Sequence, residues 1–66
     1  MILEKYEARL VALKALVSAE RKALAAMAAR AALPAGSSRA RVTTANARWA
    51  TACEARDRAL AEYEAK

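Results

Sequence analysis

The chain has 66 residues and a net charge of +5, and 58% of its residues are hydrophobic. More than half of that hydrophobic share is alanine, which contributes 21 residues and adds little to a core. Burying a large apolar side chain stabilises a fold by roughly 1.5–3 kcal/mol, whereas ordering each residue costs roughly 1.5 kcal/mol. The 15 large apolar and aromatic side chains from Ile2 to Tyr63 fall short of that cost. We therefore expect the chain to associate with a second copy of itself or with a larger protein assembly.

The composition also excludes most catalytic chemistry. The chain has no histidine, one cysteine and one glycine, so it lacks a histidine base, a cysteine pair and a glycine-rich phosphate loop. We expect no enzyme activity, no catalytic residue, no metal, no cofactor and no small-molecule substrate. No segment approaches the roughly 18 apolar residues of a membrane span, and the N-terminus lacks a signal-peptide pattern. We expect a soluble, cytoplasmic chain that does not bind membranes.

A first helix is predicted over residues 2–33, which contain neither proline nor glycine. Pro34 and Gly36, each the only residue of its type, predict a turn over residues 34–42. A second helix is predicted over residues 43–65, because the β-branched Val42-Thr43-Thr44 run suits a cap better than a helix interior. Ser38 is the alternative cap, and a start there makes the second helix overhang the first by a turn or more. The predicted fold is a single all-α domain over residues 1–66, an antiparallel two-helix hairpin.

Both predicted helices carry two series of apolar residues at heptad spacing, with one charged residue in each helix. In the first helix the series are Leu3, Leu10, Val17, Leu24 and Ala31, and Tyr6, Leu13, Glu20 and Met27. In the second they are Val42, Trp49, Arg56 and Tyr63, and Ala45, Ala52 and Ala59. In a tight hairpin, the numbers of two facing residues add to a constant. A value of 76 places the apolar series of the first helix opposite those of the second. Glu20 then faces Arg56, which predicts an ion pair that fixes the register. The alternative is that both side chains turn out to solvent.

With that sum, residues 1–9 lie beyond the end of the second helix. Ile2, Leu3 and Tyr6 are therefore left without a facing residue, and Val11 and Leu16 add apolar surface beside the seam. We expect these five side chains to form an interface with a second copy or with another protein. The alternative is a frayed N-terminus that packs on nothing.

The charge is uneven along the chain. Residues 21–48 hold six basic residues and no acidic one. Within this range Arg30, Arg39, Arg41 and Arg48 lie near the predicted turn, where they predict a basic tip that binds an acidic protein or nucleic acid. No aromatic residue is interleaved with them for base stacking, so a solvated basic loop is the alternative.

The segment Arg39-Ala40-Arg41-Val42-Thr43-Thr44, followed by a charged helix through Trp49 to Glu62, resembles the small helical head-tail joining and neck proteins of tailed bacteriophages over residues 37–64. Unlike them, the chain has no obvious β-hairpin between its helices. In length and architecture it also resembles the plasmid copy-number hairpin that dimerises into a four-helix bundle and binds paired RNA loops. The first resemblance implies an assembly protein incorporated into a virion, and the second a dimeric nucleic-acid-binding regulator. A small inhibitor or adaptor of a larger protein is the third interpretation.

Overall fold

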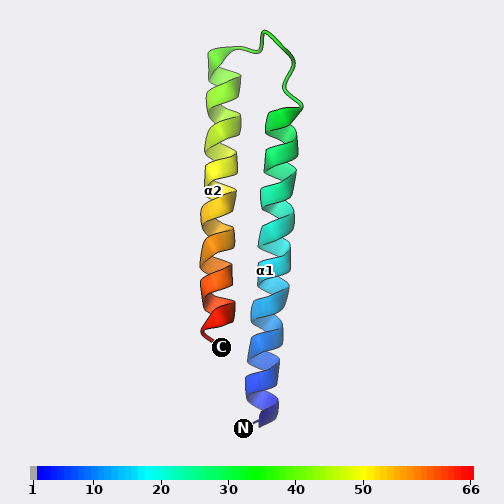
Figure 1. The fold of residues 1–66 in the computed structure, drawn as a ribbon, viewed down its shortest axis with the longest axis vertical. Coiled ribbons are helices and arrows are strands. Elements are labelled where there is room, and N and C mark those ends of the chain that lie inside the picture. Colours follow the sequence, from blue (N-terminus) through cyan, green and yellow to red (C-terminus); the bar gives the residue numbers. More distant parts are fainter. Residues whose placement is uncertain (1) are drawn as a thin grey trace.

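The computed structural model describes residues 2–66, which form two antiparallel α-helices joined by a turn (Figure 1). Helix α1 comprises Ile2–Ala31 and helix α2 comprises Arg39–Glu64. The described chain is a rod of 56 × 14 × 11 Å and contains no strand. The prediction of an all-α, two-helix hairpin is confirmed.

The turn between the helices follows from its proline, glycine and serine residues. Pro34 has no N–H group with which to continue the hydrogen bonding of α1. Gly36 adopts a φ of 85°, a conformation that side chains disfavour. The carbonyl oxygen of Pro34 accepts hydrogen bonds from the Ser37 hydroxyl at 2.6 Å and from the Ser37 N–H at 3.1 Å. Together these features reverse the chain within a few residues.

Helix α2 begins at Arg39, so the predicted start at Thr43 is wrong and the alternative cap is the one used. The Ser38 hydroxyl oxygen accepts a hydrogen bond from the Arg41 N–H at 3.2 Å, and the Ser38 backbone is extended. A serine cap contributes roughly 1 kcal/mol, whereas a threonine inside a helix costs at most about 0.7 kcal/mol relative to alanine. The cap and the additional turn of helix over residues 39–42, in which the Val42 N–H donates to the Ser38 carbonyl oxygen at 3.1 Å, together offset the lower helix propensity of Thr43 and Thr44.

Helix α1 ends at Ala31, slightly before the predicted end at Leu33. Proline disfavours helical geometry in the residue that precedes it, so Pro34 keeps Leu33 out of the helix. The two helices are consequently offset. At the turn end α2 extends past α1, and at the other end α1 extends past α2 (Figure 1).

The helices pack through a seam of mostly small side chains. The least exposed residues of α1 are spaced alternately by four and three residues and must face α2, the only other element of the described chain: Ala12, Leu16, Ala19, Ala23 and Ala26. Half-buried residues of α2 include all but the first residue of its predicted seam: Ala45, Trp49, Ala52, Arg56, Ala59 and Tyr63. Alanine lets two helix axes approach closely. The seam predicted for α2 is therefore observed, whereas α1 is rotated away from its predicted seam.

Candidate protein-protein interface

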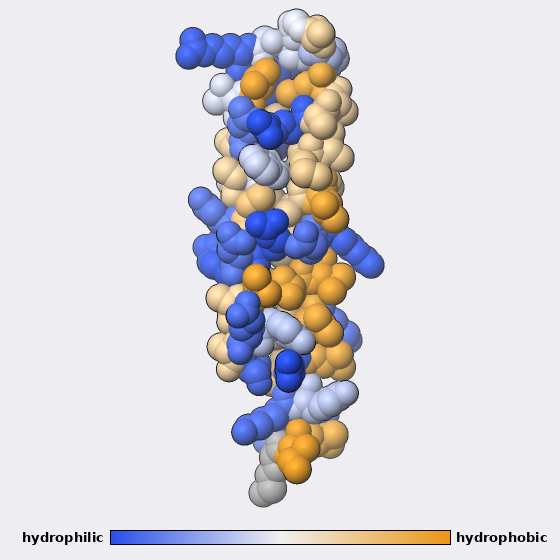
Figure 2. All heavy atoms as spheres, in the orientation of Figure 1, coloured by the Kyte–Doolittle hydropathy of each residue, from blue (hydrophilic) through white to orange (hydrophobic). Residues whose placement is uncertain are grey.

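The rotation of α1 leaves eight of its large apolar side chains outside the seam. They recur at three- and four-residue spacing along one side of the helix, and we call them the α1 stripe: Ile2, Leu3, Tyr6, Leu10, Leu13, Val17, Leu24 and Met27. Their exposed fractions range from 38% to 87%, whereas the only buried residues of the described chain are Ala12 and Ala23. In Figure 2 hydrophobic side chains gather along α1, from the middle of the rod to its N-terminal end.

Such a surface is unusual for a chain that stays alone in water. Soluble monomers rarely expose large contiguous apolar patches, and patches rimmed by polar residues mark sites of protein association. Helix α2 adds Leu60, which is also exposed, and Tyr63, which lines the same hollow as Tyr6, Leu10 and Leu13. The apolar surface thus continues from α1 onto the C-terminal end of α2.

The five predicted interface residues fall into three groups. Ile2, Leu3 and Tyr6 are exposed members of the α1 stripe. Val11 is 67% exposed but lies about 100° around the helix from Leu10, outside the stripe. Leu16 is half-buried in the seam with α2. The structure therefore brings only the first three together on one surface.

Glu20 and Arg56 face each other across the hairpin, as the sum of 76 predicts. The Arg56 Nε atom lies 4.0 Å from Glu20 Oε2, at the outer limit of an ion pair. Arg56 makes a closer contact with its neighbour Asp57, whose Oδ1 atom accepts hydrogen bonds from Nη2 at 3.1 Å and from Nε at 3.3 Å. These hydrogen bonds and the charge of Asp57 raise the pKa of Arg56, and Glu20 contributes least.

The predicted apolar surroundings of this pair are absent. The side chains of Arg56 and Glu20 are 35% and 48% exposed in the hairpin, so neither charge is stranded in an apolar layer. Exposed ion pairs contribute little to stability because water already solvates both charges. The pair marks the register of the hairpin without contributing much to its stability.

We expect the coupling between Glu20 and Arg56 to depend on Asp57. In a double-mutant cycle with alanine, the coupling energy should be close to zero in the native background, because Asp57 holds the guanidinium. It should grow in an Asp57→Ala background, where Glu20 becomes the nearest carboxylate to Arg56. Urea denaturation of the two cycles measures both values. Equal coupling in the two backgrounds would show that Asp57 does not compete for Arg56.

Two arginines lie against aromatic rings of the opposite helix, and neither contact is among the features predicted from the sequence. The Arg30 guanidinium carbon lies 4.8 Å from the centre of the Trp49 ring, and that of Arg9 lies 5.2 Å from the centre of the Tyr63 ring. Both distances allow cation–π attraction. With the sum of 76, Trp49 faces Met27 and Tyr63 faces Leu13. Arg30 and Arg9 lie three and four residues from these positions, about one helical turn, and this spacing is the sequence signal for both contacts.

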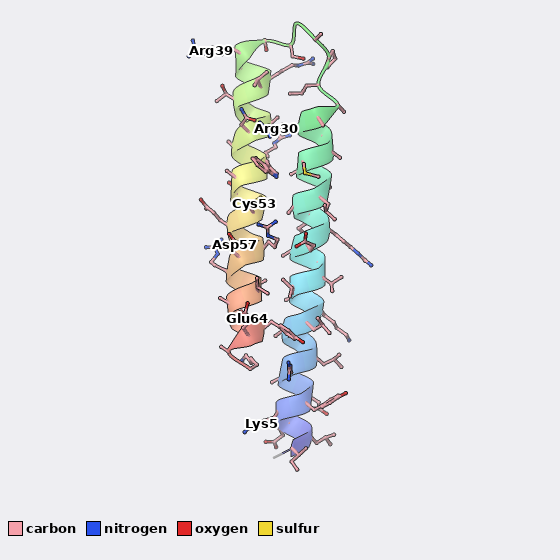
Figure 3. All side chains as sticks on the ribbon, in the orientation of Figure 1. Lys5, Arg30, Arg39, Cys53, Asp57 and Glu64 are labelled. Carbon is pink, nitrogen blue, oxygen red and sulfur yellow. The ribbon has the colours of Figure 1, made fainter. Side chains whose placement is uncertain are left out.

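The four arginines predicted to form a basic tip do not act as one cluster. Arg30 is directed at Trp49 of α2, whereas Arg39 points away from the hairpin at the turn end (Figure 3). Arg41 and Arg48 line a shallow groove on the flank opposite the stripe, where the remaining lining residues are Ala26, Ala29, Leu33, Ala40, Thr44 and Ala45. Arg39, Arg41 and Arg48 therefore remain as the candidate basic surface, and Arg30 does not belong to it.

The described residues 2–66 contain no group of three or more histidine, cysteine or acidic side chains that could hold a metal ion. Neither of their helices is long and apolar enough to cross a membrane. Comparison with models of known protein families, with curated proteins and with solved structures finds no match. The α1 stripe, whose residues are 38% to 87% exposed, is the candidate functional site.

Proposed function

We propose that the chain is a non-enzymatic assembly protein that self-associates through the α1 stripe. The observation that carries this proposal is where the apolar residues lie, because small ones line most of the helix contact and most of the large ones of α1 are outside it. On α1 the contact between the helices is lined by alanines and one large residue, Leu16, while eight large apolar side chains of this helix stay 38% to 87% exposed. Each of these side chains stabilises an assembly by roughly 1.5–3 kcal/mol if it becomes fully buried.

The weakness of the isolated hairpin supports the same conclusion. Its two buried residues, Ala12 and Ala23, supply very little apolar area. A chain near the lower size limit for a single core is usually stabilised by disulfides, metals or oligomerisation. One cysteine excludes an internal disulfide, and oligomerisation through the stripe supplies the missing core.

The resemblance to head-tail joining and neck proteins supports a finer form of the proposal, in which the assembly is part of a bacteriophage virion. A second candidate is a dimeric nucleic-acid-binding regulator. It is favoured by Arg39, Arg41 and Arg48, which belong to the range of residues 21–48 that holds six basic and no acidic residues. Phosphate contacts by such residues make binding strongly dependent on salt.

Thermal unfolding at several protein concentrations tests the proposal. If folding is coupled to association, the Tm rises with protein concentration, because dilution favours the dissociated chains. A cooperative transition with the same Tm across a hundredfold range of concentration would contradict it. Adding duplex DNA or structured RNA at low salt separates the two candidates, since the regulator gains a further salt-sensitive increase in Tm and the assembly protein does not.

A further inference from the structure

The α1 stripe extends further than α2 can cover. With Glu20 opposite Arg56, the last residue of α2, Glu64, is level with Ala12. Ile2 and Leu3 lie well beyond that level and have no facing residue in α2, while Tyr6 lines the hollow that Tyr63 also lines. Whatever covers the stripe must also cover this overhang.

Two symmetric arrangements of a pair of hairpins are available, and the overhang distinguishes them. A two-fold axis parallel to the helices places α1 on α2 of the partner, with both turns at the same end. Both overhangs then extend past both copies of α2. A two-fold axis perpendicular to the helices places α1 on α1 of the partner, antiparallel. Each overhang then lies on the C-terminal half of the partner's α1.

The stripe is complementary to itself in the antiparallel arrangement. Facing residues whose numbers add to 30 form successive apolar layers, with Leu3 on Met27, Tyr6 on Leu24 and Leu13 on Val17. Each layer occurs twice because of the symmetry. Leu10 faces Glu20, whose side chain is half exposed and can turn toward solvent at the edge of the contact. The symmetry axis then passes close to residue 15.

The charges beside the stripe favour the same orientation. Glu7 lies on the outer edge of the stripe. Edge residues of an antiparallel helix pair are each shifted by one residue from the facing positions, so their numbers add to 28, and Glu7 comes opposite Arg21 of the partner copy. Neither residue forms an ion pair within the described part of the hairpin. Lys14 meets its own copy near the axis, and its long side chain reaches solvent there. With the turns at the same end, by contrast, the ranges of six basic residues would lie side by side and repel each other.

Building on the proposed self-association, we infer that the occupant of the stripe is a second, antiparallel copy of the chain, and that the dimer therefore presents Arg39, Arg41 and Arg48 at both of its ends. Such a dimer is a two-ended connector. Each end is suited to an acidic protein surface, and the two ends face in opposite directions. One dimer thus links two acidic protein surfaces.

Distances between spin labels at the turn test this geometry. The sites are Ala35→Cys and, separately, Lys5→Cys, both in a Cys53→Ala background, since Cys53 is the only native cysteine. With a rise of 1.5 Å per residue and an axis near residue 15, two labels at position 35 are expected about 60 Å apart. Turns at the same end would put them within about 20 Å, because packed helix axes are about 8–10 Å apart. A dominant distance in that short range would overturn the inference.

A mixed sample supplies a second measurement, in which the antiparallel dimer gives the shorter of the two expected distances. When chains labelled at position 35 are mixed with chains labelled at position 5, the antiparallel dimer places the two labels about 15 Å apart along the rod. Turns at the same end would separate them by about 45 Å. An increase of Tm with concentration in each labelled variant shows that it still associates. If the distance between the two labels in the mixed sample is long and the Tm still depends on concentration, only the antiparallel orientation is overturned. If the Tm does not depend on concentration, the proposed self-association itself is contradicted.

Discussion

Replacing Val17 and Leu24 by glutamate should abolish self-association while leaving the hairpin helices in place. Both side chains lie in the middle of the α1 stripe and are about half exposed in the hairpin. About half of each side chain is left to be buried on association, and a dimer contains each of them twice, so losing this burial costs roughly 3–6 kcal/mol. The dissociation constant should therefore rise at least about a hundredfold. Sedimentation velocity over a range of concentrations measures the change.

A matched variant, Val11→Glu with Ser18→Glu, adds the same charge to α1 outside the stripe. Val11 is more exposed than Val17, and Ser18 lines a second groove, which runs between the two helices and is also lined by Ala15 and Thr51. We expect this control to associate as the native chain does, apart from a small effect of charge. If both variants weakened association equally, net charge would be the cause and the stripe would not be the contact surface.

Replacing Ala23 by leucine should destabilise the hairpin by roughly 1–3 kcal/mol, because the larger side chain forces the closely packed helices apart. Ala23 is 3% exposed and lies at the centre of the α1 side of the seam. Ala25 is exposed on the same helix, so Ala25→Leu is the control for the change in helix propensity. Urea denaturation at one fixed protein concentration compares the two variants. If Ala23→Leu were as stable as Ala25→Leu, the close packing of the helices at Ala23 would be contradicted.

The number of helices, their antiparallel pairing and the register could all be predicted from the sequence. Pro34 and Gly36 allow only one turn, and the two charged residues of the heptad series, Glu20 and Arg56, align the helices at the observed sum. These features depend on local backbone chemistry and on residue spacing. Both are fully contained in the sequence.

The face of α1 that contacts α2 could not be predicted in the same way. Two heptad series coexist on α1, one of large residues such as Leu10 and Leu24, and one of alanines that recurs at Ala12, Ala19 and Ala26. Apolar area favours the first series, whereas close approach of two helices favours the second. The choice between them depends on what else covers the large residues, and that information lies outside a single hairpin. Leu16 was assigned to an outer surface for the same reason.

The start of α2 shows a second limit of sequence reasoning. Ser38 and Thr43 both have the chemistry of a cap, and the difference between them is about 1 kcal/mol or less. Only the Ser38 hydroxyl has its backbone donor within reach, at 3.2 Å from the Arg41 nitrogen. Preferences of this size are decided by the geometry of the turn that precedes the helix.

The most direct test of self-association through the α1 stripe is the native mass of the purified chain in solution. The monomer has a mass of 7.1 kDa. We expect a species of twice that mass to predominate for the native chain and for the control with Val11 and Ser18 replaced. The variant with Val17 and Leu24 replaced should remain at the monomer mass. A native chain found only at 7.1 kDa at every concentration would contradict the account.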